Sequence, residues 1–231
     1  MSKIKAFPDP IVDYDFENVY RPSDDTYLIV DYFKYHVDSN FFDGIALEKI
    51  RKILDMGTGT GYIALSFQII KTIIPKFNPK IYASDILEEA IVLSKHNERL
   101  NKFEGEIEFV KSDLFKAFPI ALKHSFDVII FNPPYLPSSN IIQKQKFMKK
   151  IDYSWDGGKL GFEIFIRFLD EAKDFLKLSS NSRIYYVCSS RIDLELLNEL
   201  ISKNGYERTY LNKIHIFHED IYLNRLTLSV N

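Results

Sequence analysis

The chain has little of several features that would assign it to a class at once. It holds one cysteine among 231 residues, Cys188, which excludes an internal disulfide and a zinc site built from several cysteines. Its 30 basic residues are outnumbered by 32 acidic ones, so the basic excess of a dedicated nucleic-acid-binding protein is missing. Cys188 ends an apolar run and is predicted to be a buried strand residue rather than a reactive thiol.

Long apolar stretches are missing as well. No run approaches the ~18–20 apolar residues that span a membrane, and the first residues contain no apolar signal-peptide core. We therefore expect a cytoplasmic protein that makes no contact with a membrane, and we expect no metal site.

The residues that are abundant indicate a sizeable core. Apolar residues make up 46% of the chain and aromatic residues 15%, which is enough to favour a folded protein over a disordered one. This length is typical of one α/β domain. We expect residues 1–231 to form a single domain, in which residues 1–50 are an N-terminal extension and a helix that packs on the core.

Short apolar runs alternate with amphipathic segments along most of the chain. Strands are predicted at residues 52–56, 80–86, 105–113, 126–132, 182–190, 207–217 and 220–230, and helices at 21–37, 61–74, 87–100, 161–177 and 193–205. Alternation of this kind predicts a doubly wound, mostly parallel α/β sheet of seven strands with one antiparallel edge strand. The arrangement is Rossmann-like and resembles the class I fold of methyltransferases that use S-adenosylmethionine.

A glycine-rich turn follows the first of these strands, in the sequence DMGTGTG. Gly57, Gly59 and Gly61 stand at alternate positions between a strand and a helix, where glycine permits a tight turn and a close ligand. The spacing differs from the dinucleotide fingerprint, whose third glycine comes one residue later. Asp55 precedes the turn, and a carboxylate there suits the ammonium of S-adenosylmethionine better than a pyrophosphate.

Further acidic residues follow the next two strands. Asp85 is placed to accept hydrogen bonds from both ribose hydroxyls, and Asp113 from the adenine amino group, with Leu114 supplying a backbone N–H. Singly, glycines in a turn and an aspartate after a strand are usually structural. Three acids at the carboxyl ends of successive strands face one crevice, and together they predict an S-adenosylmethionine site.

The segment FNPPYLP follows the fourth strand of the alternating series. Pro133 forces Asn132 into an extended conformation, Pro134 stiffens the next step, and Tyr135 follows on the same rigid segment. The Asn132 side-chain oxygen and the Pro133 carbonyl are two acceptors that would grip a planar NH2 group and aim its lone pair at a methyl carbon. The Tyr135 ring would pack on the flat acceptor. The alternative is a strand-ending turn with structural prolines.

Taken together, the segments DMGTGTG, SD at 84–85, SDLF and NPPY resemble amino-methyltransferases of the N-P-P-Y class. VYRPSDDTYLIVD at 19–31 and WDGGKLGFEIFIRFLDEA at 155–172 resemble two segments of the HemK family in particular. The resemblance implies that Thr26, Asp55, Gly57, Asp85, Asp113 and Leu114 bind the cofactor and that residues 132–135 hold a glutamine.

About fifty residues precede the glycine turn, which makes the chain similar to the short archaeal and eukaryotic form of the HemK family. That form methylates the glutamine of the Gly-Gly-Gln motif in class I release factors. It works with a small zinc-binding activator protein that pairs with a sheet edge, so the resemblance implies both partners.

Three other functions stay open on the residues alone. An N-P-P-Y enzyme can act on the exocyclic amine of adenine or guanine in DNA or RNA, although nucleic acid is not expected as the primary partner here. A protein-lysine methyltransferase and a non-catalytic module with the same fold are the others. Lys144, Lys146, Lys149 and Lys150 cluster after the N-P-P-Y segment, either as a solvated loop or as a substrate-facing patch.

Overall fold

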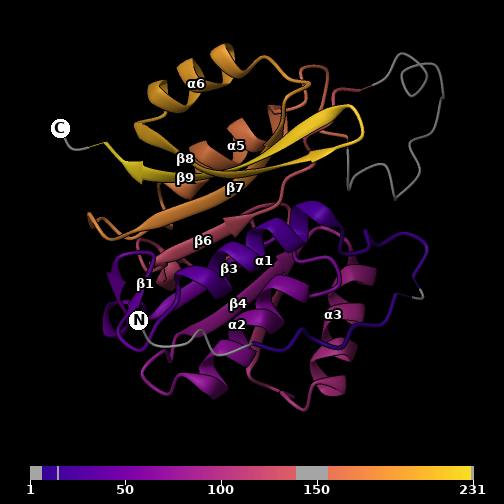
Figure 1. Ribbon diagram of the computed structural model, residues 1–231, viewed down its shortest axis with the longest axis vertical. Helices are drawn as coiled ribbons and strands as arrows, with labels where there is room; N and C mark the ends of the chain where they lie inside the picture. The colour runs from indigo at the N-terminus through magenta and orange to yellow at the C-terminus, as the bar shows by residue number, and fades with distance from the viewer. Residues whose placement is uncertain (1–6, 15, 139–155, 230–231) are drawn as a thin grey trace.

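The computed structural model describes residues 7–14, 16–138 and 156–229. In these ranges a seven-stranded sheet has the order β5-β4-β3-β6-β7-β9-β8 (Figure 1). The strands are β3 (Lys52–Met56), β4 (Lys80–Asp85), β5 (Ile107–Lys111), β6 (Val128–Phe131), β7 (Arg183–Ser189), β8 (Tyr206–Ile216) and β9 (Glu219–Leu228). The predicted fold class is thereby confirmed.

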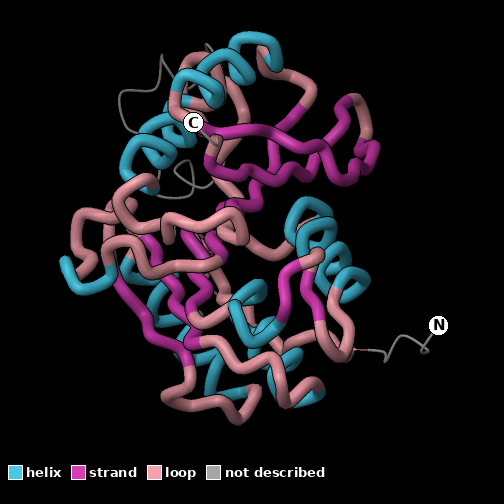
Figure 2. The backbone as a smooth tube through the Cα atoms, turned by 90° about the vertical axis from the view of Figure 1, so that its left-hand side faces the viewer, coloured by secondary structure: helices cyan, strands magenta, loops and turns pink. Residues whose placement is uncertain are grey.

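Five strands, β5 to β7 in the sheet order, run parallel, and the closing pair supplies the antiparallel element. β9 runs antiparallel to both β7 and β8, so it lies one place inside the edge strand β8. The two strands form a long hairpin in the upper half of Figure 2. No helix connects β8 to β9, and this is why the direction reverses at that side.

Helices cover both faces of the sheet. On one face α1 (Asp24–His36) and α2 (Tyr62–Ile73) share a hydrophobic core with the strands, and α3 (Glu88–Leu100) lies beside β4 and β5. On the other face α5 (Glu163–Ala172) and α6 (Leu194–Lys203) share a second core (Figure 1). Strand residues alternate between the two cores, as the pleat of a sheet covered on both faces requires.

The strand order reverses between β3 and β6, which lie side by side although the chain visits β4 and β5 between them. At such a switch point the connections leave the sheet in opposite directions and open a crevice beyond the carboxyl ends of the strands. The glycine turn follows β3 and the N-P-P-Y segment follows β6. The topology therefore brings these two segments to the same crevice.

The N-terminal extension contains a small hairpin that the sequence reading missed. Its strands β1 (Phe41–Phe42) and β2 (Ile45–Ala46) have two residues each, too few for an alternating pattern to show. The turn residue Asp43 has a φ of 44° and accepts hydrogen bonds from Tyr185 at 2.6 Å and from Arg225 at 3.0 Å. These bonds attach the extension to β7 and β9.

Two short 3-10 helices complete the described elements, η1 (Leu47–Lys49) and η2 (Ile120–Leu122). The predicted helix 161–177 is shorter in the structure, because Gly161 has a φ of 86° and the chain turns after Ala172. Cys188 is buried in β7, which confirms the predicted buried strand residue, and burial raises the pKa of its thiol to about 11. Within the described ranges, no helix is long and apolar enough to cross a membrane.

Candidate active site

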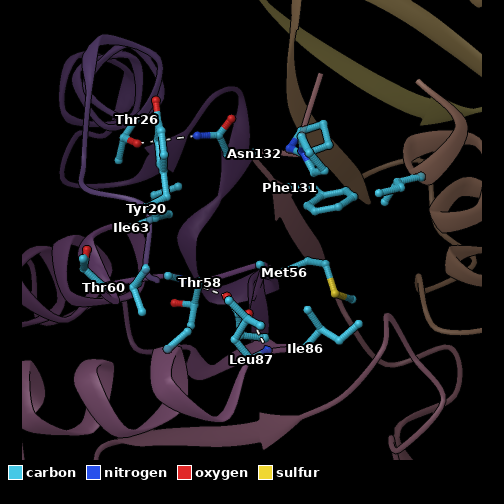
Figure 3. A pocket seen from close by; sticks show the side chains of 18 of the residues that line it. Tyr20, Thr26, Met56, Thr58, Thr60, Ile63, Ile86, Leu87, Phe131 and Asn132 are labelled. Carbon is cyan, nitrogen blue, oxygen red and sulfur yellow. Dashed lines mark hydrogen bonds between the residues drawn. The ribbon is translucent and has the colours of Figure 1, made fainter. Parts of the chain in front are cut away.

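A cleft of about 330 Å³ opens at the carboxyl ends of β3, β4 and β6 (Figure 3). Most of the predicted site residues line it, which are Thr26, Gly57, Gly59, Asp85, Asp113, Leu114, Asn132, Pro133, Pro134 and Tyr135. Asp55 and Gly61 are not among the lining residues. The lysine cluster at Lys144–Lys150 and Trp155 lie outside the described residues.

The glycine turn has a left-handed backbone at each of its three glycines. Gly57, Gly59 and Gly61 have φ values of 66°, 55° and 84°, where a side chain would strain the chain. A Cβ on Gly61 would lie 2.9 Å from the Cβ of Ser94 in α3. Gly61 therefore allows α2 to begin close against α3, and its position behind the cleft wall accounts for its absence from the lining.

Asp55 lies behind the turn and is 1% exposed. One carboxylate oxygen, Oδ2, accepts hydrogen bonds from the Thr58 hydroxyl at 2.6 Å and the Ala64 N–H at 3.2 Å. The other, Oδ1, is buried and has no hydrogen-bond partner among the described residues. Burial raises the pKa of Asp55 to about 7. An unpaired buried oxygen of this kind is suited to a cationic group, and its pairing with the cofactor ammonium stays a prediction.

Asp85 fixes the end of β4 to the glycine turn. Its Oδ2 accepts from the Gly59 N–H at 3.0 Å, and its Oδ1 from the Leu87 N–H at 2.9 Å. Burial raises the pKa of this carboxyl. A carboxylate has about four lone-pair positions, so two bonds leave room for the ribose hydroxyls expected from the sequence.

Asp113 is occupied by partners that the sequence reading did not foresee. Its carboxylate pairs with Lys116 and with Arg167 of α5, and Arg167 also lines the cleft. An adenine amino group would share the carboxylate with both cations. Arg167 lies 54 residues from Asp113 in sequence, and no spacing signal connected the two.

The acceptor end of the cleft is formed by the N-P-P-Y segment, residues 132–135, which we call the acceptor loop. The Asn132 side-chain NH2 donates to the Thr26 hydroxyl of α1 at 3.5 Å, as the dashed line in Figure 3 shows. The Asn132 Oδ1 is buried and has no partner among the described residues. The Tyr135 hydroxyl donates to Asp25 Oδ2 at 3.0 Å. Asp25 and Tyr20 line the cleft and were not predicted as site residues.

Two glycines before α5 support the acceptor loop from behind. A Cβ on Gly157 would lie 2.6 Å from the Pro134 carbonyl oxygen and would also overlap the backbone of Gly161. A Cβ on Gly161 would lie 2.9 Å from the Tyr135 carbonyl oxygen. Backbone hydrogen bonds complete the contact, with the Gly157 N–H donating to the Leu136 carbonyl at 2.9 Å. Glycines are required here because backbone packs directly on backbone.

The cleft therefore offers donors and acceptors that suit the nucleoside of an S-adenosylmethionine molecule. Backbone of the glycine turn and the carboxylate of Asp85 would hold the nucleoside, and the acceptor loop lies at the far wall. When bound, S-adenosylmethionine supplies a methyl group on a positively charged sulfur.

Comparison with known proteins agrees with this geometry. A family profile described as a methyltransferase domain matches residues 47–215. A Methanocaldococcus jannaschii protein that carries the name of an N5-glutamine methyltransferase is 35% identical over 159 residues, which are 69% of this chain and 67% of that protein. The chain belongs to the HemK family of methyltransferases. Its expected activity as a methyltransferase and S-adenosylmethionine as its cofactor are thereby confirmed.

Other HemK relatives differ in length. The fission yeast eRF1 methyltransferase catalytic subunit mtq2 is 29% identical, and the alignment covers 83% of this chain and 81% of that one. The Lactococcus lactis release factor glutamine methyltransferase is 27% identical over 74% of this chain, which spans 57% of that relative.

Solved structures show the same fold. The structure of the E. cuniculi Mtq2–Trm112 complex matches with a TM-score of 0.59 and 23% identity, over 92% of this chain and 99% of that one. The P. horikoshii TYW2 structure in complex with MeSAdo matches with a TM-score of 0.56 and 14% identity, over 94% of this chain and 67% of that one. The fold is therefore shared even where the sequences have diverged widely.

Proposed function

We propose that this HemK-family enzyme transfers a methyl group to the side-chain amide nitrogen of a protein glutamine, in the Gly-Gly-Gln motif of a class I release factor. One observation carries the proposal. The Asn132 Oδ1, on a proline-stiffened loop at the cleft wall, is a buried acceptor that has no hydrogen-bond partner in the part of the chain that the structure describes. A buried acceptor of this kind costs about 1–3 kcal/mol when unpaired, so an N–H donor from the substrate is the expected partner.

An amide NH2 matches the acceptors that the loop presents. Asn132 Oδ1 and the Pro133 carbonyl would each accept one of its two N–H bonds, which fixes the plane of the NH2 group and aims the nitrogen lone pair at the methyl carbon. The same two oxygens would stabilise the positive charge that grows on nitrogen as the N–C bond forms and the bond from the methyl carbon to sulfur breaks. The nitrogen then loses a proton to water, because an amide nitrogen that carries a methyl group, two hydrogens and a positive charge is strongly acidic.

The titratable groups favour a glutamine over a lysine acceptor. Among the described residues that line the cleft, none is His, Lys, Glu or Cys. A lysine must lose a proton before it can attack, and this needs a base at the acceptor end. The carboxylate of Asp25 contacts the acceptor loop through Tyr135, and it already accepts hydrogen bonds from Tyr135, Tyr20 and Thr26. A glutamine needs no such base.

The relatives' names support the partners that we propose. The fission yeast relative is named as the catalytic subunit of an eRF1 methyltransferase, and the E. cuniculi structure is titled as a complex with Trm112. We propose that this chain likewise acts on a release factor and pairs with a small partner subunit, which the HemK resemblance indicates to be zinc-binding. The chain would act as a single catalytic domain in the cytoplasm.

A transfer assay with labelled S-adenosylmethionine tests the proposal. The acceptors are a class I release factor, the same factor with its Gly-Gly-Gln glutamine replaced by asparagine, and adenine-bearing DNA and RNA. We expect label on the first acceptor alone, located to the glutamine by mass spectrometry. Label on nucleic acid, or on the glutamine-replaced factor, would contradict the proposal.

A further inference from the structure

Asp25 is a buried carboxylate with no part in the chemistry proposed above. It belongs to the first turn of α1 and is 3% exposed. Its Oδ1 accepts from the Thr26 N–H at 2.6 Å and the Thr26 hydroxyl at 3.2 Å, and its Oδ2 from the Tyr135 hydroxyl at 3.0 Å. The Tyr20 hydroxyl lies 3.5 Å from Oδ2. A helix N-terminus favours an acid, but an exposed acid such as Asp24 would serve that purpose equally well.

The hydrogen bonds of Asp25 have a fixed direction. An ionised carboxylate can only accept, so the Thr26 hydroxyl must donate its single proton to Asp25. The Thr26 oxygen then has only lone pairs to offer to its other neighbour, Asn132. Asn132 must therefore turn its NH2 toward Thr26, at 3.5 Å, which leaves its Oδ1 buried and unpaired.

The amide of Asn132 can bind a donor only in this orientation. With the opposite rotamer, its NH2 would face the substrate NH2, and two donors would repel each other. The two orientations have nearly the same shape, so packing alone selects between them poorly. A polar partner of fixed direction is needed to select one.

We propose that Asp25 is a positioning residue that sets the orientation of the Asn132 amide through the Thr26 hydroxyl, and thereby makes the site selective for an amide over a carboxylate. The inference deepens the proposed function and rests on it. Tyr135 strengthens the arrangement, since its bond to the second Asp25 oxygen holds the acceptor loop against α1.

Asp25→Asn tests this directly, with Asp24→Asn as the matched control. Both substitutions remove one negative charge from the first turn of α1, but only the first lets residue 25 donate to Thr26. The Thr26 hydroxyl could then donate to Asn132 and turn its amide. We expect the single-turnover rate of methyl transfer to fall about tenfold or more in Asp25→Asn, at unchanged cofactor affinity. Asp24→Asn should keep the wild-type rate.

Selectivity separates this role from a merely structural one. A release factor with Gly-Gly-Glu in place of Gly-Gly-Gln carries a carboxylate that wild-type Asn132 Oδ1 repels. In Asp25→Asn the turned amide offers donors, so inhibition by the Glu factor should strengthen relative to binding of the Gln factor. A loss of structure would instead weaken the binding of the Glu factor and of the Gln factor to the same extent. Equal rates and equal selectivity in Asp25→Asn and wild type would overturn the inference.

A second pair of variants covers the case in which Asp25→Asn unfolds. Because Thr26 also lines the cleft, the two variants are compared with each other at saturating cofactor. Thr26→Ser keeps the hydroxyl and should transfer the methyl group faster than Thr26→Val and with the selectivity for the Gln factor, whereas Thr26→Val removes the hydroxyl and should lose that selectivity. We call the proposed chain of hydrogen bonds from Asp25 through the Thr26 hydroxyl to Asn132 the relay. Equal rates and equal selectivity in Thr26→Ser and Thr26→Val would refute the relay.

A wild-type enzyme that leaves the release factor unlabelled would refute the proposed function and not the relay. The relay is then read without any acceptor, from the Asn132 side-chain NH2 signals in an NMR spectrum, assigned by their loss in Asn132→Ala. These signals should move in Thr26→Val and stay in place in Thr26→Ser. Signals that stay in place in both variants would refute the relay.

Discussion

The two halves of the cleft are held in place in different ways. On the cofactor side, short segments at the strand ends hold one another, as where Asp85 accepts from the backbone of Gly59 and Leu87. On the acceptor side, the loop 132–135 depends on parts of the chain that are distant in sequence. Asp25 is 110 residues from the Tyr135 that it anchors, and the glycines 157 and 161 pack on the loop from the other direction.

This difference predicts that the two halves can be damaged separately. The hydrogen bonds of Asp85 join residues that follow β3 and β4. Because the sheet fixes the ends of both strands, these bonds should remain as long as the sheet is folded. The conformation of the acceptor loop depends instead on two contacts: the hydrogen bond from Tyr135 to Asp25 of α1, and the packing of Gly157 and Gly161 on the loop backbone. Variants on the acceptor side should therefore lower the transfer rate at constant cofactor affinity, and variants on the cofactor side should do the reverse.

Asn132→Ala should have the largest effect. It removes the acceptor that grips the substrate amide, and loss of one such group typically costs about 10²–10³-fold in rate. Cofactor affinity, measured by calorimetry, should stay nearly unchanged. A large loss of cofactor affinity would show that Asn132 belongs to the cofactor half and that the division is misplaced.

Gly157→Ala should come next, with a fall in rate of about 10–100-fold from a loop displaced by a fraction of an ångström. The φ of Gly157 is not in the left-handed region, so the cost comes from the contacts of the new Cβ with the Pro134 carbonyl oxygen and with the Gly161 backbone. Thermal melting should show a loss of about 1–3 kcal/mol in stability. Gly105→Ala is the control, because a Cβ there meets no atom within 4 Å. It should lower stability and leave the rate intact, and a similar rate loss in both would argue against the contact.

Asp85→Asn should weaken cofactor binding about tenfold, because a neutral amide accepts less strongly than a carboxylate from the ribose hydroxyls. The rate at saturating cofactor should change little. Titration calorimetry measures the cofactor affinity, and saturation kinetics measure the rate at saturating cofactor. If Asp85→Asn binds the cofactor normally but transfers the methyl group slowly, Asp85 would belong to the acceptor half of the cleft, which would contradict the prediction.

The smallest effect concerns pH and Asp55. Burial raises its pKa from 3.8 to about 7, so the folded chain holds a proton that the unfolded chain has already released. The stability from the neutral form is complete below about pH 4 and is lost as pH rises through 7. Without cofactor, the free energy of unfolding should fall by about 1 kcal/mol between about pH 6 and 7.5 from this group. In Asp55→Asn the free energy of unfolding should lose this contribution and fall less over the same pH range. A pH dependence equal to that of the wild type would contradict the assignment to Asp55.

The cofactor half was largely predictable from sequence, because its signals are local. Gly57 and Gly59 stand at fixed offsets from a strand, and Asp85 ends the next one, so a linear pattern contains the geometry. The acceptor loop was equally visible as a rigid segment after β6. The contact of Asp25 with Tyr135 was not, because it acts across the fold, and the same is true of the pair of Arg167 with Asp113 and of the hairpin around Asp43. Only the packed structure brings these residues to their partners.

Strand boundaries show the same contrast. The five parallel strands were placed to within a few residues because apolar runs bounded by turn residues mark them. The order of the last two strands was expected only as an antiparallel edge. Which of them pairs with β7 depends on a hairpin that folds back on the sheet, and here β9 takes that place.

A structure of the enzyme with a cofactor analogue and a Gly-Gly-Gln peptide tests the central claim most directly. We predict that the glutamine amide nitrogen lies within about 3.2 Å of both Asn132 Oδ1 and the Pro133 carbonyl oxygen, the usual reach of an N–H···O bond. The Asn132 NH2 should still face Thr26. A glutamine nitrogen that is out of reach of both oxygens, in a cleft that holds the analogue, would contradict the account.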